Sequence, residues 1–215
     1  MKRFGLAVLG LAVLLASLGA AVGAGSEEKP MSYAEREQFL KDFDRAGLDT
    51  TPGDAMFLRI LVAASGAKRG VEVGSYKGFG AMNMGIAFER NGGHLDTIEI
   101  NPATADACRK NLRTVGLQDT VTCITGDALK VLPTLEGTYD FLFIDAKKSD
   151  YMRYFKMMEP KLAPGAVIAA DNSIRSARAM QDFLDYLEKS PDYETVTIRA
   201  SMEKKDGMTV AHKIR

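Results

Sequence analysis

The stretch that decides the fold is GVEVGSYKGFG, residues 70–80. Its first five residues predict a short buried strand, and the glycines after them predict a tight turn that opens into a helix. Glycine lets the backbone approach a ligand closely, and a helix N-terminus can bind an anion. The glycine spacing differs from the dinucleotide-binding pattern G-x-G-x-x-G. A turn that only connects the strand to the helix stays open as the alternative.

Strands and helices alternate on the C-terminal side of this stretch. Apolar runs predict further strands at 94–100, 121–125, 139–144, 166–170, 194–200 and 208–214. Helices are expected at 32–43, 55–65, 81–89, 102–115, 128–132, 150–162 and 176–188, with a loop at 48–54 and a helix stop at residues 163–165. The alternation favours a Rossmann-like α/β fold: a mostly parallel seven-stranded sheet with helices on both faces. The last two strands, with no helix between them, predict a C-terminal antiparallel hairpin.

Composition removes several classes of function. Lys and Arg number 28, as do Asp and Glu, so the formal net charge is zero and no nucleic-acid partner is expected. The only cysteines, Cys108 and Cys123, argue against a disulfide framework or a zinc site. Because His94 and His212 are the only histidines, the sequence argues against a metal site with three histidine ligands and against a histidine base. A hard metal ion bound by oxygen ligands remains open.

The first 25 residues predict a targeting segment. A basic start is followed by an apolar run and then by small residues, as in a signal peptide cleaved near Ala24 or in an uncleaved membrane anchor. Residues 26–215 then form a single domain, and membrane contact is expected only through residues 1–25. The expected location is exported or membrane-anchored, in a periplasm-like compartment, with an anchor facing the cytoplasm as the alternative.

Polar residues follow the predicted strands at the edge where ligands bind in such sheets. Glu99 ends the second strand, roughly 20 residues after the glycine turn, where an acidic side chain can accept both hydroxyls of a ribose. Asp127 follows the third strand and can accept a hydrogen bond from an adenine amino group or cap the next helix. We leave both roles of Asp127 open.

The fourth and fifth strands end in oxygen ligands. If these strands are neighbours, Asp145, Asp171 and Asn172 converge, and two carboxylates with an amide oxygen suit Mg²⁺. Lys148, one helical turn after Asp145, is a candidate base. The alternative is that the acidic residues form turns and that Lys147 and Lys148 form a solvated basic edge.

Jointly, these motifs resemble the class I S-adenosylmethionine-dependent O-methyltransferases of the catechol and caffeoyl-CoA type, from about Thr51 to Arg215. Residues 145–154 resemble the run D-A-x-K-x-x-Y-x-x-Y of that family. The resemblance assigns cofactor binding to Glu72, Gly74, Ser75, Tyr76, Gly78, Phe79, Glu99, Ile100, Asp127, Ala128 and Asp145. It assigns a divalent cation to Asp145, Asp171 and Asn172, catalysis to Lys148, and substrate contact to Lys148, Asn172 and Glu203.

The resemblance implies methyl transfer from S-adenosylmethionine to a vicinal hydroxyl of a small aromatic, catechol-like substrate. It also implies Mg²⁺, or Mn²⁺ or Ca²⁺ in its place, and a homodimer as the assembly to test. Two residues depart from the family pattern. Gly80 stands where the family has Ser or Thr, so one side-chain contact to the methionine end of the cofactor is lost, and Ala146-Lys147 in place of the His-Trp pair of catechol enzymes leaves the substrate open. The alternatives are a metal-independent methyltransferase acting on another small molecule and a catalytically silent domain that binds S-adenosylmethionine.

Overall fold

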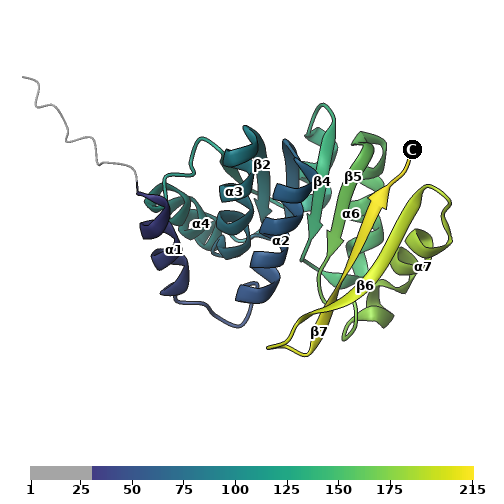
Figure 1. The fold of residues 1–215 in the computed structure, drawn as a ribbon. Helices are drawn as coiled ribbons and strands as arrows, with labels where there is room; N and C mark the ends of the chain where they lie inside the picture. Colours follow the sequence, from purple (N-terminus) through teal and green to yellow (C-terminus); the bar gives the residue numbers. More distant parts are fainter. Residues whose placement is uncertain (1–30) are drawn as a thin grey trace, which may run out of the picture.

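The computed structural model describes residues 31–215, and the predicted signal peptide or anchor at residues 1–25 lies outside the described residues. A seven-stranded sheet has the order β3-β2-β1-β4-β5-β7-β6 (Figure 1). The strands are β1 (Arg69–Val73), β2 (His94–Glu99), β3 (Val121–Thr125), β4 (Tyr139–Ile144), β5 (Leu162–Ala170), β6 (Tyr193–Ser201) and β7 (Asp206–Lys213). Strands β1 to β5 are parallel, and β7 runs antiparallel to both β5 and β6. The predicted Rossmann-like sheet and its closing hairpin are confirmed.

Helices cover both faces of the sheet. They are α1 (Tyr33–Lys41), α2 (Pro52–Ser65), α3 (Phe79–Asn91), α4 (Pro102–Thr114), α5 (Ala128–Val131), α6 (Tyr151–Met158) and α7 (Gln181–Lys189), with short 3₁₀ turns η1 (Leu132–Thr134), η2 (Lys148–Asp150), η3 (Glu159–Lys161) and η4 (Ala177–Met180). One apolar cluster joins the sheet to α1–α4, and the other joins it to α5–α7.

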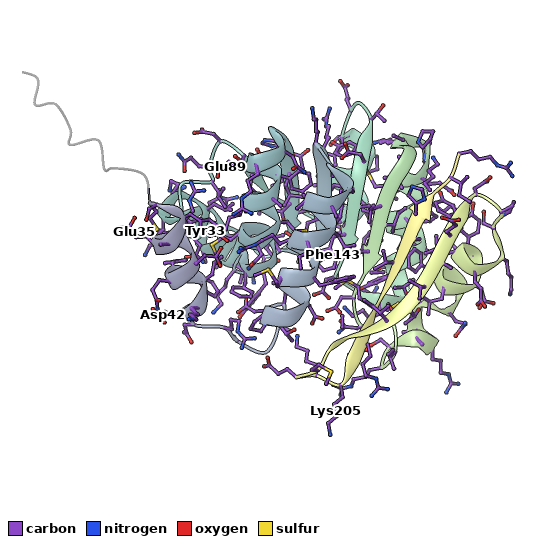
Figure 2. The ribbon with its side chains drawn as sticks, viewed as in Figure 1. Tyr33, Glu35, Asp42, Glu89, Phe143 and Lys205 are labelled. Carbon is purple, nitrogen blue, oxygen red and sulfur yellow. The ribbon has the colours of Figure 1, made fainter. Side chains whose placement is uncertain are left out.

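Strand β4 contributes apolar side chains to the clusters on both faces of the sheet. Successive side chains of a strand point to opposite faces. Phe141 and Phe143 therefore pack with α2 and α3, whereas Leu142 and Ile144 pack with α6 and α7. Figure 2 shows Phe143 inside the molecule, and all four side chains are fully buried. A strand with no polar alternation is thus the expected sequence for the centre of a covered parallel sheet.

Helix α2 begins earlier than the sequence analysis predicted. Pro52 and Gly53 were expected in a loop, but Pro52 is the first residue of the helix and the Thr51 hydroxyl accepts a hydrogen bond from the Asp54 amide. Threonine as a cap followed by proline is a favourable helix start, because proline has no amide hydrogen to leave unpaired.

The segment at residues 163–165 also differs from its prediction. It was expected to close a helix, but it lies within β5, and the preceding helical region is divided into η2, α6 and η3. The pairing of β5 with β4 shifts register between Tyr139 and Phe141, and Gly165 has a φ of 87°. This irregular pairing accommodates Pro164 in a strand, since proline cannot donate to a regular ladder.

The point where strand order reverses lies between β1 and β4. Strand β1 pairs in parallel with β2 on one side and with β4 on the other. Loops at the carboxyl ends of these strands diverge there, which is where open α/β sheets bind ligands. Within residues 31–215, no helix has the length and apolar character needed to cross a bilayer.

Gly70 in β1 provides a test of this packing. A Cβ atom at Gly70 would lie 2.4 Å from Phe88 Cζ and 3.1 Å from Leu95 Cδ1. We expect Gly70→Ala to lower the free energy of unfolding by about 1–3 kcal/mol, because the core must shift to admit the methyl group. Gly53→Ala is the matched control, because its Cβ would meet no atom closer than 3.9 Å and alanine favours the helix. Equal effects of the two substitutions in urea unfolding would contradict the described packing.

Candidate active site

A cavity of about 890 Å³ opens at the carboxyl ends of the central strands. One part of its wall comes from the glycine turn after β1 and from the segments that follow β2 and β3. The other part comes from the ends of β4 and β5, the loop before α2 and the turn between β6 and β7. The cavity therefore lies at the reversal of strand order, as the fold predicts.

The glycine turn and Asp145 are in close contact. Gly74 has a φ of 95°, and a Cβ atom there would lie 2.2 Å from the carbonyl oxygen of Asp145. The Gly74 amide donates to the carbonyl of Ile98 at 2.9 Å, and the Asp145 amide donates to that of Val73 at 2.9 Å. Only glycine fits this position, since any side chain would separate the turn from β4.

Glu99 is held as an acceptor at the end of β2. Its Oε2 accepts from the Tyr76 amide at 2.8 Å and its Oε1 from the Asn101 amide at 2.9 Å. Tyr76 has a φ of 48°, so the turn adopts an uncommon conformation that directs this amide to the carboxylate. An ionised carboxylate has about four acceptor sites, so both oxygens can accept further donors from the cavity.

Asp127 and Ala128 line the cavity at the start of α5. The Asp127 side chain accepts a hydrogen bond from the Leu129 amide at 3.0 Å, so it is the N-cap of that helix. This confirms the capping role, and the adenine contact of Asp127 stays a prediction. Ser75 and Ile100 also line this part of the cavity.

Lys148 lines the part of the cavity formed by the end of β4, and its amine lies between two oxygen atoms. Its Nζ is 2.8 Å from Asp145 Oδ1 and 3.0 Å from the hydroxyl of Tyr151. That hydroxyl in turn donates to the main-chain oxygen of Asp171 at 3.2 Å. The sequence placed Lys148 near Asp145, and the structure adds Tyr151 as the buried residue that links the lysine to the end of β5.

Asn172 is oriented by a residue from a distant part of the chain. Its amide nitrogen donates to Asp206 Oδ2 at 3.2 Å, which leaves the amide oxygen as its acceptor group. The other oxygen of Asp206, Oδ1, accepts from three backbone amides, those of Ile174, Arg175 and Gly207. Although burial opposes ionisation, these amide donors lower the pKa of Asp206. Asp206 thus holds both Asn172 and the segment that follows it.

Asp171 is the least satisfied carboxylate of the group. It is 1% exposed, and its Oδ1 has no hydrogen-bond partner among the described residues. Burial, together with the negative charge of Asp145, raises the pKa of Asp171 to about 7. The Asp171 amide donates to the carbonyl of Ile144, which ties the two strand ends together. A nearby cation would relieve both the burial cost and the repulsion.

The donor set at this point fits a hard divalent cation. Two carboxylates and an amide oxygen are the ligand types that Mg²⁺, Mn²⁺ and Ca²⁺ take. Within residues 31–215 no three histidine, cysteine, aspartate or glutamate side chains form a cluster that could hold a metal ion. The predicted set contains only two such residues, Asp145 and Asp171, and depends on Asn172 for its third oxygen.

Five of the predicted site residues do not line the cavity: Glu72, Gly78, Phe79, Asp171 and Glu203. The first three lie behind the glycine turn, where Gly78 contacts Cys108 and Phe79 stacks on Phe43. Glu203 is on the exposed β6–β7 turn, 3.6 Å from the guanidinium of Arg45. The functional roles of all five residues stay predictions.

Thr50 lines the cavity and was not predicted. A Cβ atom on Gly80 would lie 2.9 Å from Glu72 Oε1 and 3.1 Å from the Thr50 hydroxyl. The space that a serine or threonine would need at position 80 is therefore taken by Thr50 from the loop before α2. No local pattern could reveal this, because the two residues are thirty positions apart. Arg175, Lys204 and Asp206 are further lining residues that the site prediction omitted.

Glu72 gives the apoprotein a testable pH dependence. Burial, only partly offset by the hydrogen bond from Thr97, raises the pKa of Glu72 from 4.5 to about 8. Below pH 4.5 the carboxyl is protonated in both states; between pH 4.5 and 8 it ionises only in the unfolded chain. We expect the wild type to lose stability over this range relative to Glu72→Gln, by on the order of a few kcal/mol.

Thermal unfolding of both proteins at pH 5 and pH 8 measures this difference. Asp182→Asn on the surface serves as the control for loss of one acidic group. A constant difference in melting temperature between the wild type and Glu72→Gln at both pH values would show that Glu72 is ionised in the folded protein.

Comparison with known proteins agrees with this architecture. The sequence model of the family described as O-methyltransferase matches residues 25–214. A catechol O-methyltransferase from Niastella koreensis is 34% identical over 66% of this chain and 66% of its own length. One from Mycobacterium tuberculosis is 33% identical over 68% of this chain and 64% of its own. The matched segments thus span about two thirds of these relatives.

A solved structure shares the fold as well. The O-methyltransferase TomG from Streptomyces achromogenes, involved in tomaymycin synthesis and solved in complex with SAM, is 26% identical, with a TM-score of 0.74 over 85% of this chain and 89% of that chain. The resemblance inferred from the strand-end motifs is confirmed. From the family match and the catechol O-methyltransferase relatives, the chain belongs to the O-methyltransferase family.

Proposed function

We propose that this protein transfers the methyl group of S-adenosylmethionine to one hydroxyl of a small catechol-like substrate, with a divalent cation at Asp145, Asp171 and Asn172. The observation that carries the proposal is the buried, unpartnered Oδ1 of Asp171 beside a second carboxylate. Relatives named catechol O-methyltransferase and a neighbour solved in complex with SAM support the substrate class and the cofactor.

The glycine turn and the two strand ends beside it would hold the cofactor. The amides of the turn and the acceptor oxygens of Glu99 face the same part of the cavity. A ribose offers two vicinal hydroxyls, and the carboxylate of Glu99 is pre-oriented by two backbone amides to accept them. The fixed orientation matters because methyl transfer is in-line and depends on alignment of the reacting atoms.

Mg²⁺ is the expected cation, and Mn²⁺ or Ca²⁺ would suit the same oxygen ligands. When bound, such an ion lowers the pKa of a coordinated hydroxyl and orients the two oxygens of a catechol. The protein contributes the two carboxylates and the amide oxygen that Asp206 orients. Asp145 also retains its contact with Lys148, which keeps the candidate base beside this group of ligands.

Lys148 is proposed to remove the proton from the substrate hydroxyl as a neutral amine, a form that a divalent cation bound beside it would favour by charge repulsion. The side chain of Lys148 is 24% exposed, and the contacts of its amine with Asp145 and Tyr151 limit its movement. A base must lie within hydrogen-bond reach of the proton it takes. Lys148 is the lysine that meets this condition next to the proposed cation ligands, whereas Lys147 is 71% exposed and pairs with Asp150.

The location of the enzyme is a separate proposal. The family match begins at residue 25, where the predicted targeting segment ends. We propose that residues 1–25 direct export or anchor the domain at a membrane. N-terminal sequencing of the protein from its native host tests the proposal, since a mature chain that starts near residue 25 indicates cleavage.

Metal dependence is tested by methyl transfer to catechol in Mg²⁺ and in EDTA. We expect EDTA to abolish turnover and Asp171→Asn to reduce it by at least about 100-fold, because one anionic ligand is lost. Binding of S-adenosylmethionine, measured by calorimetry, should change little. Asp185→Asn, which removes a charge from exposed α7, is the control and should behave as the wild type.

The results separate the alternative functions. Turnover that persists in EDTA would contradict the metal site and favour a metal-independent methyltransferase. Binding of S-adenosylmethionine without turnover of any catechol would favour a silent cofactor-binding domain.

Replacement of Lys148 tests the proposed base. Lys148→Met should lower kcat by about 10²–10⁴-fold, the usual contribution of general base catalysis. KM for S-adenosylmethionine should stay within a few-fold, because the glycine turn and Glu99 are untouched. Lys147→Met is the matched control one residue away, and a similar loss in both variants would refute a specific role for Lys148.

A further inference from the structure

The acidic groups of the cavity already have partners. Each acidic side chain that lines it accepts from a backbone amide or a cationic side chain: Glu99, Asp127, Asp145, Asp150 and Asp206. Across the described part of the chain, none of these carboxylates forms a salt bridge with Arg175, a cationic residue that also lines the cavity. Within residues 31–215, Arg175 forms no ion pair; one guanidinium nitrogen donates to the carbonyl of Lys204 at 3.3 Å.

Arg175 is held near the proposed cation ligands by its backbone. Its amide donates to the buried Asp206 at 2.9 Å, and the Ser176 amide donates to the carbonyl of Asn172 at 3.0 Å. The segment is therefore a defined turn that starts at Asn172, a proposed ligand and substrate contact. A guanidinium has five N–H donors in a planar fork, and the contact with Lys204 leaves most of them for a ligand.

The loop before α2 adds an apolar side chain to the same cavity. Leu48 lines the cavity and is 74% exposed, so its side chain is accessible to a ligand. Lys204 completes this side and donates to the carbonyl of Asp49 at 3.1 Å. By contrast, Lys205 is exposed at the turn and points away from the fold (Figure 2). An accessible leucine side chain and a guanidinium in one cavity suit an aromatic ring that carries a negative charge.

We propose that the enzyme selects catechols that bear a carboxylate, and that Arg175 binds this carboxylate at the cavity mouth. The inference rests on the proposed function and adds the substrate class to it. A carboxylate accepts two parallel hydrogen bonds from a guanidinium, which fixes the orientation of the ring as well as attracting it. A neutral catechol lacks this contact, and a catechol with an amine is repelled by Arg175.

The test compares 3,4-dihydroxybenzoate with its methyl ester, which keeps the ring and both hydroxyls but removes the charge. We expect the wild type to favour the acid by about tenfold or more in kcat/KM, mainly through KM. In Arg175→Met, kcat/KM for the acid should fall about tenfold more than kcat/KM for the ester. Arg175→Lys should restore part of the preference for the acid. Added salt should weaken the preference in the wild type.

Arg178→Met is the matched control, because Arg178 is exposed three residues later in η4 and does not line the cavity. It should keep the preference of the wild type for the acid. Equal kcat/KM for acid and ester in the wild type, or an unchanged ratio in Arg175→Met, would overturn the inference and leave the proposed function intact. Failure of the wild type to methylate either compound in Mg²⁺ would overturn the proposed function and this inference with it.

Discussion

The contact between Gly74 and the backbone of Asp145 is the constraint on which the site depends. It requires a residue without a side chain, because a Cβ atom would lie 2.2 Å from a carbonyl oxygen. The amide of Asp145 then bonds to β1, and the amide of Asp171 bonds to β4. The ends of three neighbouring strands thus lie side by side, so that the glycine turn, Asp145 and Asn172 line a single cavity, with Asp171 buried directly before Asn172.

This convergence has an electrostatic cost that the chain only partly offsets. Lys148 neutralises Asp145, and four donors stabilise the ionised form of Asp206. Within residues 31–215, Asp171 has no donor at Oδ1, and burial together with the charge of Asp145 raises its pKa. Natural proteins keep an unsatisfied buried carboxylate mainly where a ligand satisfies it. The unsatisfied carboxylate of Asp171 is therefore a physical argument for the proposed cation that is independent of the family resemblance.

The parts of the site that could be predicted from the sequence are those that follow a strand directly. Asp145, Asp171 and Asn172 were placed together because parallel strands end at the same edge, and Glu99 for the same reason. Thr50 and Asp206 were not placed, since a loop or hairpin position depends on long-range packing. The same limit explains the strand at Pro164: local sequence favours a helix stop, but pairing with β4 extends β5 through it.

The contrast between strand-end residues and loop residues also separates the proposed cofactor-binding part of the cavity from the proposed substrate-binding part. The cofactor side of the cavity consists of strand ends and turns whose positions follow from the sheet. The substrate side is assembled from the loop before α2, the turn after Asn172 and the β6–β7 turn, linked by the bonds from Arg175 to Lys204 and from Lys204 to Asp49. Substitutions in these segments can change the charge at the mouth without disturbing the sheet. On our proposal, side chains at the strand ends carry out the reaction, while a few loop side chains, with Arg175 foremost, select the substrate.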